Sequence, residues 1–378
     1  MLLGLLALGP AAFIYVDRTK KSSKSSLIKV DPSYYPTISI IVPTYNESSI
    51  IHLKLLNLSR LNYPDDLTEI VLVDSNSSDN TVEIARRFLE EKPQMKFKIL
   101  VEKERKGKSH ALNYALNYCN GEVVIVSDAD CFWPPDILKK SVPFMADQKV
   151  GAVGGPKIIL NPDESWVTRL EQGFLKLANA MRLDESRDGS TPFFEGGFSA
   201  FKKGFFDKFD PYATGSDDCG TVINVVEKNF RAIIVSEAEF YSPFPKSFKT
   251  RLNVKLRRAN QLVKVFTNYL NLFIKGKLKT SKKTIIPNIT LYLFSPSALV
   301  VFLALTLYFS YYVPFILLLL LLLIIPKVRF FAYEALESNL LLFLAIFGVA
   351  TNRNFSIWKQ PDDRKGIDKE KLNRLDLI

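Results

Sequence analysis

Between residues 37 and 126, short apolar runs rich in β-branched residues alternate with longer segments whose apolar residues recur at helical spacing. The apolar runs are 38–42, 70–73, 97–101 and 123–126, and the helical segments are 48–60, 79–91 and 107–118. Continuous apolar strands separated by helices are typical of a parallel sheet that helices cover on both faces. The sequence therefore predicts an α/β domain, whose ligands should bind beyond the carboxyl ends of the strands.

Beyond residue 130 the alternation loosens. An apolar run covers 150–153, a helical pattern covers about 163–185, and polar motifs gather at 194–220. We expect this part of the domain to hold a second substrate.

The C-terminal third is apolar enough to enter a membrane. Residues 285–325 carry no charged side chain, and about 20 apolar residues are enough for one helix to cross a bilayer. Two spans are predicted, at about 287–309 and 311–326. A third apolar segment at 330–351 contains Glu334, Glu337 and Asn339. Because a charge at the bilayer centre costs about 3 kcal/mol, we expect this segment to lie partly in the interface.

The formal net charge of +11 comes largely from Lys and Arg at the borders of these apolar segments. They cluster at 18–24, 246–258 and 275–283, with Lys327 and Arg329. Flanks of this kind usually face cytoplasmic headgroups, so the sequence predicts a multi-pass protein of the cell membrane with a cytoplasmic catalytic domain. A nucleic-acid partner is not expected. Three cysteines and two histidines without a Cys-x-x-Cys pair support neither a disulfide framework nor a zinc site.

These patterns predict six segments. They are an N-terminal hydrophobic anchor (1–17), a basic linker (18–36), the α/β domain (37–245), basic amphipathic helices (246–284), a transmembrane region of two or three helices (285–352) and a polar tail (353–378).

Two carboxylates follow the apolar run at 123–126. Asp128 and Asp130 would face the same side of an extended chain, where they could bind Mg²⁺ or Mn²⁺ together with a diphosphate. An Asp-x-Asp spacing alone is a weak signal, since surface turns produce it often. Its position at a strand end, with Asp74 and Lys108 expected at the same edge of the sheet, makes it stronger.

Other polar residues stand at predicted strand and helix ends. Ser78 or Asp79 could cap a helix that starts near Thr81, but capping explains Asp74 poorly, because that residue ends a strand. Lys108 opens a helix, where anions bind readily. A P-loop is rejected, because Glu102 stands where its first glycine would be required.

The motif Gly-Ser-Asp-Asp-Cys at 215–219 precedes another helical segment. Ser216 or Asp217 could cap that helix. Capping needs only one carboxylate, so the neighbouring one is available to accept a proton from an acceptor hydroxyl.

Taken together, these motifs resemble the family 2 inverting glycosyltransferases with a GT-A fold, over about residues 37–265. The resemblance rests on six motifs in the family's order: Ile-Ile-Val-Pro-Thr-Tyr-Asn-Glu (40–47), Val-Asp-Ser-Asn-Ser-Ser-Asp-Asn-Thr (73–81), Lys-Gly-Lys-Ser-His-Ala-Leu-Asn (106–113), Ser-Asp-Ala-Asp (127–130), Phe-Glu-Gly-Gly-Phe-Ser-Ala-Phe (194–201) and Gly-Ser-Asp-Asp (215–218).

The resemblance implies a role for each matching position. Four residues would hold the nucleotide base and ribose: Pro43, Tyr45, Glu47 and Asp74. Lys108 and Asp128 would contact the nucleotide, and Asp130, with Asp128, would bind the metal. The family commonly has Thr-Glu-Asp where this chain has Ser-Asp-Asp, which assigns the general base to Asp218 and leaves Asp217 as its acidic neighbour. Gly196 and Gly197 would line the acceptor side, although an ordinary tight turn explains them as well.

One family motif is missing. Processive synthases of this family carry Gln-x-x-Arg-Trp, whereas this chain has Lys-Leu-Arg-Arg-Ala at 255–259. The aromatic residue that would stack on an acceptor sugar is absent, so a non-processive enzyme is expected. Arg257 and Arg258 could bind the diphosphate or a lipid phosphate, and plain headgroup contact explains them equally well.

The resulting hypothesis is a metal-dependent, membrane-bound transferase that moves a sugar from a nucleotide-diphosphate donor to a lipid-linked or saccharide acceptor with inversion. A processive polysaccharide synthase is the alternative within the family. A haloacid-dehalogenase-like phosphatase also uses Asp-x-Asp, but three strand–helix units precede the motif here and Phe132 follows it. An inactive membrane scaffold should have lost a carboxylate, yet all four key ones are present: Asp74, Asp128, Asp130 and Asp218.

Overall fold

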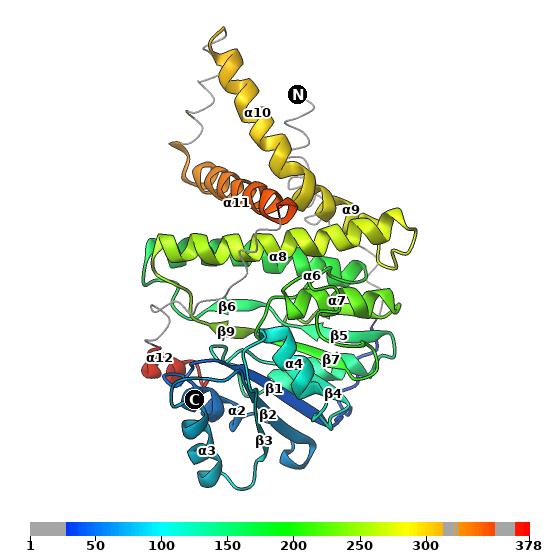
Figure 1. The fold of residues 1–378 in the computed structure, drawn as a ribbon, viewed down its shortest axis with the longest axis vertical. Coiled ribbons are helices and arrows are strands. Elements are labelled where there is room, and N and C mark those ends of the chain that lie inside the picture. The colour runs from blue at the N-terminus through cyan, green and yellow to red at the C-terminus, as the bar shows by residue number, and fades with distance from the viewer. Residues whose placement is uncertain (1–27, 313–320, 322–323, 352–366) are drawn as a thin grey trace. The chain divides into compact units, whose positions relative to one another are not determined.

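The computed structural model describes residues 28–312, 321, 324–351 and 367–378. The chain divides into two compact units (Figure 1). The catalytic unit comprises residues 28–247 together with 367–378, and the helical unit comprises residues 248–351. The predicted anchor at 1–17 lies outside the described residues, and the predicted segment boundaries stay predictions.

A seven-stranded sheet in the order β3-β2-β1-β4-β7-β5-β8 forms the centre of the catalytic unit. Its strands are β1 (Ile38–Thr44), β2 (Thr68–Asp74), β3 (Lys96–Val101), β4 (Val123–Val126), β5 (Val150–Gly154), β7 (Ser199–Lys202) and β8 (Arg231–Ile234). All neighbouring strands are parallel except β7, which runs antiparallel between β4 and β5. A second, two-stranded sheet pairs β6 (Lys157–Ile159) with β9 (Phe240–Ser242). The predicted α/β class and mostly parallel sheet are confirmed.

Helices follow the strands as expected. They are α2 (Ile51–Leu58), α3 (Thr81–Glu91), α4 (Lys108–Leu116), α5 (Ile137–Ser141), α6 (Trp166–Asp188), α7 (Asp217–Glu227) and α12 (Lys369–Arg374), with short 3₁₀ turns η1 (Asp65–Leu67) and η2 (Val142–Ala146). The start of α6 is fixed by a capping box, in which Ser165 and Thr168 each accept the other's backbone N–H.

Both faces of the large sheet are covered by apolar side chains. Ile40 and Val42 of β1 belong to one buried cluster, whereas Ile41 between them belongs to another. Successive strand residues point to opposite faces, so this alternation shows that neither face is open to water. The fully buried runs in the sequence therefore have a direct structural explanation.

The helical unit contains α8 (Phe248–Ile274), α9 (Lys282–Ile289), the π-helical turn η3 (Thr290–Phe294), α10 (Ser295–Ser310) and α11 (Pro326–Ala350). Two helical stretches, Lys282–Ser310 and Val328–Ala350, are long and apolar enough to cross a membrane, by length and composition. They include the predicted segment 287–309 and all but the last residue of the predicted segment 330–351. The predicted span at 311–326 lies mostly outside the described residues.

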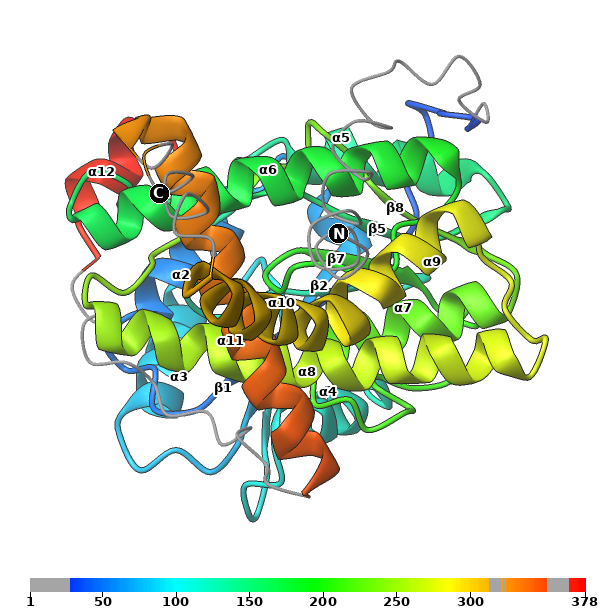
Figure 2. The same ribbon diagram turned by 90° about the horizontal axis from the view of Figure 1, so that it is seen from above.

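The two glutamates of α11 are paired with cations of α8, which α11 crosses (Figure 2). Arg251 contacts Glu334 at 2.7 Å, and Lys255 contacts Glu337 at 2.6 Å. All four side chains are buried. Because buried charges persist when they are paired and hydrogen-bonded, this cluster explains how α11 can carry two carboxylates among apolar residues.

Candidate active site

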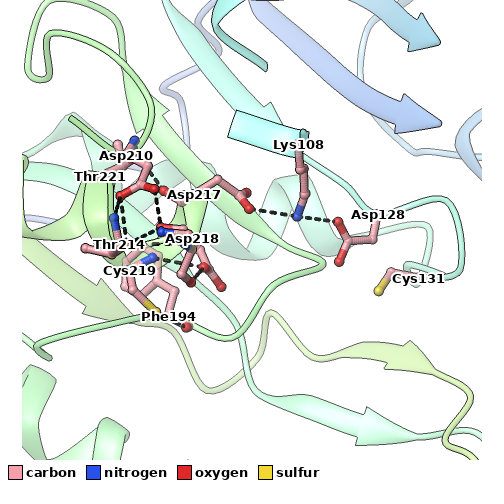
Figure 3. Close-up of polar contacts among 12 residues, drawn as sticks. Lys108, Asp128, Cys131, Phe194, Asp210, Thr214, Asp217, Asp218, Cys219 and Thr221 are labelled. Atoms are coloured by element: carbon pink, nitrogen blue, oxygen red, sulfur yellow. Dashed lines mark hydrogen bonds and ion pairs between the residues drawn. The ribbon is translucent and has the colours of Figure 1, made fainter. Parts of the chain in front are cut away.

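The site is centred on Lys108, the first residue of α4, which lies between carboxylates from two other loops (Figure 3). Its Nζ is 2.7 Å from Asp128 Oδ1 and 3.0 Å from Asp217 Oδ1. Asp128 follows β4 and Asp217 begins α7, so the lysine joins the predicted metal loop (Asp128–Asp130) to the acidic neighbour of the predicted base, Asp218. The sequence suggested that Lys108 and Asp128 share one edge of the sheet; the structure brings these two into contact and adds Asp217.

Local backbone geometry explains the place of Lys108. Gly107 at the N-cap of α4 has φ +100°, which glycine adopts readily and which turns the chain into the helix. Burial lowers the pKa of Lys108, but the nearby carboxylates of Asp128, Asp217 and Asp218 outweigh it and raise the pKa above its usual value. The ammonium group therefore remains charged and suited to a phosphate.

Asp128 and Asp130 are held in a turn after β4. The Cys131 backbone N–H donates to the Asp128 carbonyl at 3.1 Å, so the expectation that both aspartates sit on an extended chain is wrong. The turn still brings one ligand atom each from Asp128, Asp130 and Cys131 within 4.8 Å of one another. Two carboxylates are suitable ligands for Mg²⁺ or Mn²⁺. Burial raises the pKa of the Cys131 thiol, and the two nearby aspartates raise it further. The carboxylates are therefore the ligands of this group that fit such a cation.

The paired aspartates begin α7. Ser216 occupies the N-cap, one of the two residues expected there, but its hydroxyl makes no cap hydrogen bond and donates instead to Asp218 Oδ1. The Cys219 backbone N–H also donates to that oxygen, at 2.9 Å. Burial, opposed by Lys108 and reinforced by Asp218 and Asp128, raises the pKa of Asp217 to about 7. Burial likewise raises the pKa of Asp218 above its usual value, opposed by Lys108 and by the hydrogen bonds from Ser216 and Cys219.

Gly196 lies between the metal loop and the predicted base. A Cβ atom added to it would be 3.2 Å from Asp128 Oδ2 and 3.5 Å from Asp218 Oδ2. Gly197 has φ +122°, and a Cβ there would collide with Phe240 and Cys131. The carboxylates beside Gly196, and the positive φ and crowding at Gly197, leave little room for a side chain at either position.

The residues predicted for the base and ribose stand at the ends of β1 and β2. Pro43 lies within β1, and the Tyr45 ring has the Arg105 guanidinium 3.8 Å from its centre. Glu47 is buried where the chain turns into α2. Sequence reasoning gave Arg105 no individual role, although it belongs to the basic stretch before α4. Arg257 and Arg258 lie in α8 of the helical unit, and their contact with the diphosphate stays a prediction.

Asp74 is buried and accepts hydrogen bonds from its own neighbourhood. Thr44 Oγ1 and Ser77 Oγ donate to Oδ1 at 2.9 and 2.6 Å, and the Ser77 N–H donates to Oδ2 at 2.8 Å. The carboxylate thus ties the loops after β1 and β2 together, and contact with a ribose stays a prediction. The N-cap of α3 is Asn80, which makes no side-chain cap hydrogen bond, so the expected cap at Ser78 or Asp79 is wrong. Asp79, one residue earlier, accepts the Thr81 N–H at 3.1 Å.

Two buried polar groups near the site were missed by sequence reasoning. Glu102 accepts from Ser75 Oγ at 2.7 Å and lies 2.6 Å from His110 Nδ1. Lys54 of α2 donates to the Cys131 carbonyl at 2.5 Å from beneath the metal loop, and burial lowers its pKa to about 7. Lys54 lies within a helical apolar pattern, and that pattern does not predict the contact with Cys131.

A mostly parallel sheet, two acidic residues after its central strand and a paired carboxylate near them are the arrangement expected of a GT-A fold. Residues 39–209 match the model of glycosyl transferase family 2. Over these residues the chain is similar to this family of glycosyltransferases, as its motifs indicated.

The chain is similar to several glycosyltransferases. It is 29% identical to the solved mannosyltransferase PcManGT from Pyrobaculum calidifontis in complex with GDP-Man and Mn²⁺, with a TM-score of 0.77 over 93% of this chain and 98% of that one. It is 34% identical to a beta-monoglucosyldiacylglycerol synthase of Trichormus variabilis over 46% of this chain and 36% of that protein. It is 28% identical to a poly-beta-1,6-N-acetyl-D-glucosamine synthase of Staphylococcus epidermidis over 50% of this chain and 45% of that protein. The chain thus spans less than half the length of these two curated relatives.

Proposed function

We propose that this protein transfers a sugar from a nucleotide-diphosphate donor to a lipid-linked or saccharide acceptor at a membrane, with inversion and without processive elongation. The contact of Lys108 with both Asp128 and Asp217 is the observation that carries the proposal. It places one cation between Asp128, which would hold the metal for the leaving diphosphate, and Asp217, the direct neighbour of the base proposed for the acceptor.

Asp128 and Asp130 would hold a divalent cation, which would supply charge neutralisation for the departing diphosphate. Lys108 would bind the diphosphate as well, because an incoming phosphate competes with the two carboxylates for its ammonium group. The charge on Lys108 is maintained by those carboxylates until the donor arrives.

Asp218 is the proposed base. Both hydrogen bonds described above end on its Oδ1, whereas Oδ2 faces Gly196. An acceptor hydroxyl lying against this glycine could transfer its proton to Oδ2 as it attacks the anomeric carbon. Attack from the face opposite the diphosphate would invert that carbon. Asp217, held by Lys108, would position the lysine rather than take the proton.

GDP-mannose with Mn²⁺ is the first donor to test, because the similar solved mannosyltransferase is in complex with both. A diacylglycerol-linked acceptor is supported by the glucosyldiacylglycerol synthase. The missing Gln-x-x-Arg-Trp motif supports a single transfer rather than chain growth.

The test uses the full chain purified in native lipid, with GDP- and UDP-sugars and with Mn²⁺, Mg²⁺ or a chelator. Acceptors are diacylglycerol, polyprenyl phosphate and a short saccharide, and the anomeric configuration of the product is read by NMR. We expect transfer with inversion that is lost with chelator and in Asp130→Asn, and kept in the exposed control Asp65→Asn. Equal transfer by Asp130→Asn and the parent, or no transfer from any donor, would refute the proposal.

A further inference from the structure

The segment 367–378, predicted from sequence as part of a polar tail, is packed into the catalytic unit. Leu372 and Leu377 are fully buried and Ile378 is nearly so. They belong to the same apolar cluster as Ala129, Cys131, Phe132 and Trp133, which belong to or directly follow the metal loop. We call residues 368–378 the docked tail.

One buried side chain binds both the docked tail and the metal loop. Asn57 of α2 donates through Nδ2 to the Leu377 carbonyl at 2.6 Å and to the Trp133 carbonyl at 2.7 Å. Its Oδ1 accepts the Trp133 backbone N–H at 2.9 Å. A carboxamide has two N–H donors, so both are used, one on each partner. Displacing the tail would leave one donor buried without a partner.

Trp133 extends this connection to the loop that contains Gly196 and Gly197, which we call the glycine loop. Its indole Nε1 donates to the Gly197 carbonyl at 2.8 Å, and its ring packs edge-on against Phe198 with centroids 5.0 Å apart. Trp133 therefore shares the Asn57 side chain with the docked tail. It follows the Asp128–Asp130 turn in the sequence, and its indole contacts the glycine loop at Gly197. A movement of Trp133 would change the positions of both loops.

We propose that the docked tail is a positioning element, which holds Trp133 and thereby sets the spacing of the metal loop and the glycine loop. It contacts no reactant and acts only through Asn57 and Trp133. The inference rests on the proposed function, because it assumes that Asp128 and Asp130 bind a divalent cation. Coupling between two sites is reciprocal, so cation binding should in turn stabilise the tail.

The test compares Leu372→Asp with Leu375→Asp, since Leu372 of α12 is fully buried, whereas Leu375, the C-cap residue of that helix, is 40% exposed. Direct Mn²⁺ binding is measured by electron paramagnetic resonance in the presence of GDP. Mutating a residue that orients metal ligands from outside the coordination sphere typically lowers the metal affinity at least tenfold. We expect about a tenfold loss for Leu372→Asp, a smaller loss for Leu372→Ala, and none for Leu375→Asp. Activity of Leu372→Asp should recover at high Mn²⁺.

Hydrogen exchange of the parent protein gives the second readout. Amides of residues 368–378 should exchange more slowly with Mn²⁺ and GDP than without them, which a tail that only stabilises the fold would not show. The inference is overturned if the parent binds Mn²⁺ but tail exchange is unchanged, or if Leu372→Ala and Leu372→Asp bind Mn²⁺ as the parent does. A parent that binds no Mn²⁺ would overturn the proposed function as well.

Discussion

Gly196→Ala should abolish most activity while leaving the fold intact. The added methyl group would lie 3.2 Å from Asp128 Oδ2, closer than almost all Cβ contacts, and 3.5 Å from Asp218 Oδ2. One carboxylate would have to move by a few tenths of an ångström, and the methyl would occupy space proposed for the acceptor. Small misplacements of reacting groups can cost about 100-fold in rate, equivalent to about 2.7 kcal/mol in the activation barrier.

The assay measures kcat/KM for sugar transfer together with the thermal unfolding midpoint. Gly204→Ala is the matched control, because that glycine has φ +88° and open space around its Cβ position. We expect the control to lose about 1 kcal/mol of stability and keep its activity, whereas Gly196→Ala keeps its stability and loses activity about 100-fold. Unchanged kcat/KM in Gly196→Ala would refute the placement of the acceptor beside this glycine.

Three further predictions follow from the charged groups. Lys108→Met should raise the donor KM at least tenfold. The increase in KM should be smaller for a donor analogue that lacks the β-phosphate, and an equal increase in KM for both donors would contradict phosphate binding. The pKa of Asp217 is raised to about 7 in the folded protein, so ionising this carboxyl group costs more in the folded state than in the unfolded chain. The free energy of unfolding should therefore fall as the pH rises from 4 to 7. In metal-free protein, Asp217→Asn should therefore become more stable relative to the parent over this range, by up to about 4 kcal/mol, and a pH-independent difference in unfolding free energy would contradict this. Arg251→Met should destabilise the helical unit by about 3 to 5 kcal/mol, because Glu334 and Glu337 would share one cation; thermal unfolding in detergent, with exposed Arg87→Met as control, measures it.

The fold could be predicted because its strongest signals are local. The strand β4 coincides with the predicted run 123–126, four β-branched residues between turns. The strand β2 begins earlier than its apolar run, at Thr68, because pairing with β1 extends to Ile38 opposite Thr68. Such extensions depend on the partner strand, which the apolar pattern of one segment does not contain.

The site could be predicted only in part. Strand-end positions brought out Asp128, Asp130 and Lys108, but the hydrogen bond that closes the Asp128–Cys131 turn depends on packing after β4. The partners of α11's glutamates and of Asn57 lie far away in the sequence, so no local spacing signals them. Contacts between distant segments are set by the completed fold.

The docked tail also constrains how residues 248–366 could be arranged in a bilayer. The polypeptide leaves the catalytic unit after residue 247 and is back inside it by residue 367. Both points must therefore be on one side of any membrane, so the intervening chain crosses it an even number of times. The two apolar helical stretches satisfy this condition if both cross, and a single or triple crossing would require the buried leucines of the tail to leave their core.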